Sequence, residues 1–327
     1  MSGSANIELI GPNGERKEYL NDECTLKNGD NIGNDLLNSF FTALTDSETY
    51  NSTRARINMG TGTSPTNLAW TELESFYKPL TGYNPHLNSP NYINSGVAEG
   101  DYFVLTGGYI FDFVAGQLVG NFTELGIDFN SSITNSSNES RVNTRLLIRD
   151  SLGNPTAISI KEDEQLRVTY ILKARIPLEP HVDIIPYIED GVESTITVTT
   201  SLTGSGIFTS LVSPYFSPSS SGSARYIYAT QNSPSTELNE LGNIGSTSRI
   251  TSADYSSINN VNYRYAEFGT TDGNLEGGIG GFVPDTYQGG IDSAYLMYKW
   301  GVSPKINKLE TQKLSFNFAT TFSREGE

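Results

Sequence analysis

The sequence has little cysteine and histidine, and it has no long apolar run. Its 327 residues include a single cysteine, Cys24, so no disulfide can form within the chain. Two histidines, His86 and His181, leave little material for a histidine-based metal or catalytic site. No stretch approaches the roughly 18 consecutive apolar residues that a membrane span requires. The sequence therefore argues against disulfide-stabilised and membrane-spanning proteins, and we expect no membrane partner.

Basic residues are scarce as well. Lys plus Arg number 21 against 37 Asp plus Glu, which gives a formal net charge of −16. Proteins that bind nucleic acid need clustered cations to replace the counterions of the phosphates, so we expect no nucleic-acid partner. The first six residues, Met1 to Asn6, show no basic segment followed by an apolar run. The sequence therefore predicts no secretory signal.

Aromatic residues and turn formers are abundant instead. The chain contains 18 Tyr, 15 Phe and 32 Gly, and short apolar runs alternate with Gly, Ser, Thr and Asn. The clearest strand is expected at 167–176, where Val168, Tyr170 and Leu172 recur at a period of two. The same alternation occurs in three other segments, 109–113, 195–202 and 314–323. This pattern predicts a protein built mainly of β-strands.

One segment has the period of a helix. Asn34 and Asp35 are good N-cap residues, and an apolar stripe of helical spacing follows them. The residues of that stripe are Leu36, Leu37, Phe40, Phe41 and Leu44. They predict a short helix of about three turns near the N-terminus.

Prolines mark the expected domain boundary. Between Pro177 and Glu189 the strand pattern breaks and then restarts in a new register. The predicted fold is all-β, with two β-sandwich (jelly-roll-like) domains, residues 1–178 and 179–327, and one short N-terminal helix. Within the first domain, the Gly and Pro residues between 150 and 155 predict a hairpin turn that joins 145–148 to 158–160. Composition predicts two long loops, 213–224, rich in Ser and Pro, and 272–290, rich in Gly.

Two glycine clusters are similar to phosphate-binding loops but lack their context. Gly277–Gly281 is followed by Pro284 and by no helical pattern, so we expect a flexible loop. Gly60–Pro65 lacks the Gly-Lys-Ser/Thr end that contacts phosphate and magnesium. We expect a tight turn there, after a strand at 56–59.

Acidic clusters are the remaining candidates for chemistry. Adjacent carboxylates at Glu162–Glu164 and Glu189–Asp190 are typical of solvated turns, although paired carboxylates also act in glycosidases. Asp272–Asn274 and Asn28–Asn31 hold fragments of a calcium loop without its closing Glu. No Gly-x-Ser-x-Gly motif is present, and Cys24 has no adjacent cation that would activate its thiol. We therefore assign no catalytic, cofactor-binding or metal-binding residue.

Four segments carry a resemblance to a known family. They are Leu36–Leu44 with Ile57–Pro65, Gly120–Ile127, Arg145–Thr156 continuing to Tyr170, and Trp300–Lys305 leading into Leu314–Phe318. In this order they resemble virion structural proteins of tailed bacteriophages, of the tail-fibre, appendage or collar-associated kind.

The resemblance implies a non-enzymatic structural protein of the virion. It implies assembly as a homo-oligomer, a trimer or higher, on the tail, collar or fibre, with itself and other virion proteins as partners. The protein would be made in the cytoplasm of the bacterial host and would then belong to the virion. The family has no catalytic motif and implies no cofactor or metal.

Two alternatives remain open from the sequence. The first is a receptor-binding module for bacterial surface glycan, in which tyrosines and Trp300 stack on sugar rings. The second is a polysaccharide depolymerase, which is disfavoured because no β-helix repeat is visible. Tyrosines in or near the predicted loops are candidate interface residues because tyrosine combines apolar area with a hydroxyl group. They are Tyr215, Tyr226, Tyr228, Tyr255, Tyr263 and Tyr265.

Overall fold

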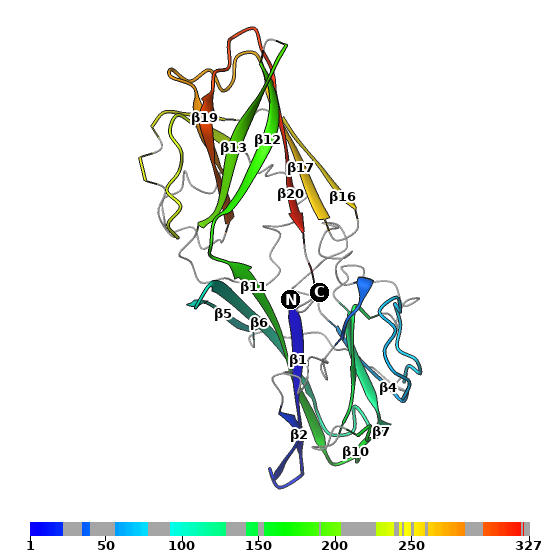
Figure 1. Cartoon of the computed structure of the whole chain (residues 1–327). Helices are drawn as coiled ribbons and strands as arrows, with labels where there is room; N and C mark the ends of the chain where they lie inside the picture. Colours follow the sequence, from blue (N-terminus) through cyan, green and yellow to red (C-terminus); the bar gives the residue numbers. More distant parts are fainter. Residues whose placement is uncertain are drawn as a thin grey trace.

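The structure is a computed structural model of the chain. It describes residues 1–21, 35–39, 56–77, 92–128, 142–149, 154–189, 191–203, 227–238, 242–243, 245–249, 252–258, 261–284, 297–321 and 323. This part is almost entirely strand and turn, which confirms the all-β prediction (Figure 1).

The predicted N-terminal helix lies mostly outside the described residues. Its expected first residue, Leu36, instead belongs to the two-residue strand β3 (Asp35–Leu36), which pairs with residues 144 and 145. Phe40, Phe41 and Leu44 are not among the described residues. Pairing with a distant strand has overridden the helical spacing at Leu36.

The first half of the chain forms two larger sheets and one small one. The five-stranded sheet has the order β2 (Arg16–Asn21), β1 (Ser2–Ile10), β11 (Gln165–Pro177), β6 (Tyr102–Phe113) and β5 (Tyr92–Glu99). The four-stranded sheet has the order β3, β9 (Thr144–Leu147), β8 (Glu124–Asp128) and β4 (Arg56–Gly60). The small sheet pairs β10 (Ile158–Ile160) with β7 (Gly120–Phe122).

Strand β11 organises the first core. Burial alternates along it as the sequence predicts, with Val168, Tyr170 and Leu172 each at most 1% exposed. It lies between β1 and β6 and pairs antiparallel with β1 along residues 165–173 and with β6 along residues 166–177. Tyr109 and Phe111 of β6, which were expected to share one face, are also buried. A central strand with one apolar face therefore collects the inward side chains of three strands.

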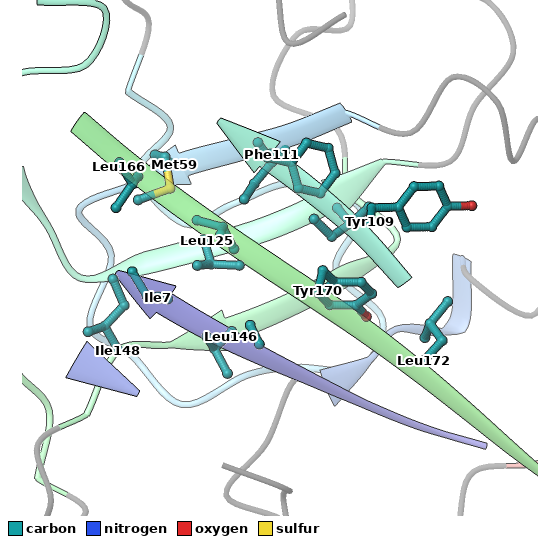
Figure 2. Close-up of a cluster of buried hydrophobic side chains, with 14 of the residues drawn as sticks. Ile7, Met59, Tyr109, Phe111, Leu125, Leu146, Ile148, Leu166, Tyr170 and Leu172 are labelled. Atoms are coloured by element: carbon teal, nitrogen blue, oxygen red, sulfur yellow. The ribbon is translucent and has the colours of Figure 1, made fainter. Parts of the chain in front are cut away.

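Both larger sheets contribute to one hydrophobic cluster. Figure 2 shows Tyr170 and Leu166 of β11 and Ile7 of β1 gathered with Met59 of β4 and Leu125 of β8. All five side chains are at most 2% exposed. The four-stranded sheet is thus held to the five-stranded sheet by apolar side chains from both, which is the main favourable term in folding.

The second half forms two further sheets. The six-stranded sheet has the order β12 (His181–Glu189), β13 (Val192–Thr203), β19 (Met297–Ile306), β18 (Ile279–Pro284), β14 (Ile227–Thr230) and β15 (Thr247–Arg249). The three-stranded sheet has the order β16 (Ser252–Ile258), β17 (Val261–Phe268) and β20 (Leu314–Thr321). A second hydrophobic cluster joins them through Phe282 of β18, Phe268 of β17 and Phe316 of β20.

The Gly-rich segment 272–290 was expected to be a loop, and for residues 279–284 this prediction is wrong. These residues form β18, which lies inside the six-stranded sheet between β14 and β19. The glycines are required by close approach of neighbouring backbone. A Cβ at Gly280 would lie 2.7 Å from the Gln231 carbonyl oxygen, and one at Gly281 would collide with the Trp300 carbonyl. Composition misleads here because glycine serves tight packing in a strand as well as loop geometry.

The hairpin expected between 145–148 and 158–160 forms only in part. Arg149 and Pro155 make an isolated bridge, and the Thr156 amide donates to the Ile148 carbonyl at 3.0 Å. The flanking strands then separate, because β9 pairs with β8 and β10 pairs with β7. The predicted loop 213–224 lies outside the described residues.

The chain passes between the two sets of sheets at residues 178–180. No sheet in the described part takes strands from both sides of this point. The hydrophobic clusters are less strictly divided, because Leu202 of β13 belongs to the first cluster and Tyr298 of β19 packs against it. The amino group of Met1 donates to the Ser323 carbonyl at 2.8 Å, so the described ends of the chain lie side by side (Figure 1).

Candidate functional site

A buried ion pair between Arg145 and Glu124 is the most elaborate polar feature of the described residues. Arg145 lies on β9 and Glu124 on β8, and both side chains are fully buried. The Arg145 Nε donates to Glu124 Oε2 at 2.7 Å. Burying two charges is expensive unless their remaining donors and acceptors are also satisfied, so their other partners decide what the pair does.

The second Glu124 oxygen binds the segment that follows β4. Glu124 Oε1 accepts from the backbone amide of Gly62 at 3.0 Å and from that of Ser75 at 2.9 Å. A Cβ at Gly60 or at Gly62 would lie 2.5–2.6 Å from this carboxylate oxygen or from Glu74, so both positions require glycine. The carboxylate thus holds two ends of the loop 61–75 to the sheet.

Arg145 binds the middle of the same loop. Its Nη1 donates to the Ser64 carbonyl at 2.9 Å and to the Thr66 hydroxyl at 3.1 Å. Its Nη2 lies 3.4 Å from Glu74 Oε2. The guanidinium also lies 4.7 Å from the centre of the Trp70 ring, within the range of a cation–π interaction.

This network does not resemble a catalytic centre. The Glu124 carboxylate accepts hydrogen bonds on both oxygens, and the guanidinium is engaged along its whole fork. Such groups are positioned to hold a loop rather than to exchange protons with a substrate. Residues 61–65 follow β4 as irregular chain with a bend at Ser64 rather than as the expected tight turn, and they form one end of a loop fastened by a buried charge pair.

Glu74 links the network to solvent and gives it a pH dependence. The Ser64 hydroxyl donates to Glu74 at 2.6 Å, and this bond, with a second one from the Ser64 amide, lowers the pKa of Glu74 below its ordinary value of 4.5. A carboxyl whose pKa is lower in the folded state stabilises the fold above its ordinary pKa. That contribution is lost as the pH falls through the lowered value.

We therefore expect Glu74→Gln to weaken the fold mainly near neutral pH. The difference in unfolding free energy between the parent and the variant should be largest at about pH 7 and should shrink at about pH 3. Urea unfolding at the two pH values measures it. A difference that stays constant would show that the ionised Glu74 does not contribute to stability.

Sequence analysis did not predict that Glu124 and Arg145 form an ion pair. The two residues lie in two separate segments of the family resemblance, and residues 60–65 lie in a third. The structure brings the three segments together at one point. A signal was present: Glu124 directly precedes Leu125, and Arg145 directly precedes Leu146 and Leu147, in short strands of the core, and buried charges need partners.

The Asp272–Asn274 turn, which carries a fragment of a calcium loop, is occupied by a lysine. Lys308 is 8% exposed, and its Nζ donates to Asn274 Oδ1 at 2.8 Å and to the Thr270 carbonyl at 3.3 Å. Burial lowers the pKa of Lys308. An ammonium group thus binds oxygens of this turn, those of Asn274 and Thr270.

The other candidates lie apart from one another. Glu162–Glu164 forms the turn between β10 and β11, as predicted, and the Glu164 carboxylate accepts from the Lys161 amide at 2.8 Å. His181 begins β12 and lies 3.1 Å from Asp183. Cys24, His86 and Asn28–Asn31 lie outside the described residues.

The candidate interface tyrosines have different environments. Tyr228 is buried at 7% exposure, and the Tyr265 hydroxyl donates to Glu267 at 2.9 Å. Tyr255 and Tyr263 belong to β16 and β17, and Tyr215 and Tyr226 lie outside the described residues. Of the tyrosines whose side chains the structure describes, Tyr228 thus belongs to the core rather than to a surface.

An exposed apolar surface lies elsewhere, on the hairpin of β12 and β13. Among the described residues, five of the eleven exposed large apolar side chains belong to it. They are Val182, Ile184 and Ile188 on one side of the hairpin, and Ile185 and Val192 on the other. Ile184 is 74% exposed, which is unusual for a strand residue of a packed sheet. Sequence analysis predicted the strand at 195–202 but did not single out this hairpin.

Comparison with known proteins adds no relative. No family model, no curated protein and no solved structure matches the chain. Among the described residues, no helix has the length and hydropathy needed to cross a bilayer. Within the same ranges, no group of three or more His, Cys, Asp or Glu side chains is placed to hold a metal ion.

Proposed function

We propose that this protein is a non-enzymatic structural component of a tailed-phage virion, assembled as a homo-oligomer on the tail, collar or fibre. A trimer or a higher oligomer is the expected form, with itself and other virion proteins as partners. The sequence resemblance supplies the class of assembly. The exposed apolar side chains of the β12–β13 hairpin supply the physical reason to expect a partner.

The hairpin is the observation that carries the proposal. Contiguous apolar side chains left in water cost free energy, and in a native protein they commonly mark an interaction surface. Val182, Ile184 and Ile188, which share one side of β12, are 55–74% exposed, while apolar residues farther along the same sheet are buried. A subunit of an assembly can bury such a surface against a neighbouring subunit.

The convergence of the resemblance segments supports the same proposal. Three of the four segments meet at the Arg145–Glu124 network, so they form one structural unit. We further propose that residues 1–178 and 179–327 are two β-sandwich domains of jelly-roll type. In each half of the chain, the two larger sheets contribute side chains to one hydrophobic cluster, which supports this arrangement.

The glycan-binding alternative has less support. Trp300, the residue expected to stack on a sugar, packs against the second hydrophobic cluster and lies next to Gly281. A side chain used in packing presents less of its face to a ligand. We therefore give preference to the architectural role.

The solution mass of the purified full-length chain tests the proposal. Light scattering across a range of concentrations should give a stable oligomer of at least three copies. A monomer at every concentration would contradict the homo-oligomer. Assembly with other virion proteins is then measured by adding the chain to particles that lack it, where incorporation is expected.

A further inference from the structure

The free edge of β12 is the clearest place for a second copy to bind. β12 is the end strand of the six-stranded sheet and pairs only with β13 among the described strands. We infer that β12 pairs antiparallel with β12 of a second copy, around a two-fold axis at Ile185, and joins the two six-stranded sheets. This inference deepens the proposed homo-oligomer and rests on it.

One face of β12 is apolar and unburied. Val182, Ile184, Pro186 and Ile188, here called the β12 face, lie on the same side of the strand and are all exposed. Their partners on β13 at three of these positions are threonines, Thr199, Thr197 and Thr195. The opposite side packs in part against the second hydrophobic cluster, where Ile196 is 4% exposed, while Ile185 at the edge is 40% exposed. The β12 face is therefore the side of this hairpin with the most exposed apolar residues.

The edge itself is poorly guarded. Native edge strands are commonly protected from pairing by lysines or by bulges. The segment 181–203 contains no Lys or Arg, and the register of β12 on β13 is unbroken over nine pairs. Two edge-type residues are present, Pro186 and Asp183, the latter on the side of Ile196. Antiparallel ladders alternate bonded and non-bonded pairs, and a proline is accommodated where its nitrogen points away from the ladder.

The proline therefore indicates which backbone groups are free. Residues of the same parity as Pro186, namely 182, 184 and 188, direct their N–H and C=O groups toward the edge. Around an axis at Ile185, residue 182 faces 188 of the second copy and residue 184 faces 186. Every edge N–H then meets a carbonyl, and the lack of an N–H at Pro186 leaves one carbonyl of each copy without a donor.

Avoidance of like charges selects this register over its neighbours. With the axis at Ile185, His181 faces the acidic Glu189 of the second copy, and Asp183 faces Tyr187. An axis one residue earlier would set Glu179 against Glu189, and an axis one residue later would set Asp183 against Glu189. Like charges directly opposite one another destabilise a sheet. Of these three registers, only the central one avoids them, and it joins the two β12 faces into one apolar surface.

A two-fold contact requires an even number of copies. Together with the proposed oligomer of at least three copies, light scattering of the full-length chain should therefore show an even-numbered assembly, such as a tetramer or a hexamer. The Ile184→Lys variant should have half of that mass, because a charged side chain would be placed in the joined apolar surface. Val114→Lys is the matched control, since Val114 is 57% exposed but lies away from the hairpin. Circular dichroism of both variants checks that the fold is kept.

A charge exchange tests the register. His181→Glu should shift the oligomer toward its half-mass form, and His181→Glu combined with Glu189→Lys should restore the parent mass. An odd-numbered parent oligomer, or an oligomer that Ile184→Lys leaves unchanged, would overturn the β12 contact while the proposed function stands. A parent chain that is monomeric at every concentration would overturn both. If the parent is monomeric but binds a different protein, and Ile184→Lys abolishes that binding, the result also contradicts pairing of β12 with a second copy of this chain.

Discussion

Arg145→Met should destabilise the protein by about 3–5 kcal/mol, because it leaves the Glu124 carboxylate buried without its cation. The loop 61–75 would also lose its bonds from Arg145 to Ser64 and Thr66. Such a loss is a large share of the total stability of an ordinary domain. Urea unfolding followed by circular dichroism measures it.

Arg167→Met is the matched control. Arg167 also pairs with a carboxylate, Asp112 at 2.6 Å, but the two side chains are 34% and 45% exposed. Exposed ion pairs contribute roughly 0–1 kcal/mol, so this variant should lose little. Equal losses for the two arginines would show that the buried network does not hold the loop.

A second substitution separates charge from packing. Glu124→Gln in the Arg145→Met background removes the unpaired charge but retains an oxygen for the amides of Gly62 and Ser75. It should recover part of the lost stability. A further loss would mean that the carboxylate is stabilised by groups other than Arg145.

Phe282→Ala should cost about 3–5 kcal/mol in the second half of the chain. Phe282 is 1% exposed, and its ring centre lies 4.4 Å from that of Phe316 and 5.9 Å from that of Phe268. The substitution leaves a cavity where the six-stranded and three-stranded sheets meet. Leu309→Ala, at a site that is 56% exposed, is the control and should change stability by less than about 0.5 kcal/mol.

The two variants together test the predicted domain boundary. If residues 1–178 and 179–327 are separate domains, Phe282→Ala should accelerate amide exchange only in peptides after residue 180. Arg145→Met should accelerate it only in peptides before that residue. Hydrogen exchange followed by mass spectrometry resolves the two halves. Faster exchange across the whole chain in either variant would show one cooperative unit, coupled through contacts such as that of Leu202 with the first cluster.

Local pattern predicted the strands and their inward faces. Val168, Tyr170 and Leu172 alternate in sequence and are buried in the structure, because a strand places every second side chain on one face. The same holds for Ile196 and Leu202 of β13. The glycine pattern of 279–284 was misleading, because the need for glycine comes from neighbouring strands rather than from a turn.

By itself, the sequence determined the all-β class, the positions of the main strands and the acidic, cysteine-poor character of the chain. These properties depend on composition and on residues close together along the chain. Only the tertiary structure decided that Arg145 and Glu124 are buried partners, that β18 lies inside a sheet and that the β12 face is left uncovered. Each of these depends on strand order. Strand order sets which distant residues meet, such as Arg145 and Ser64, which are 81 positions apart, and no local period encodes it.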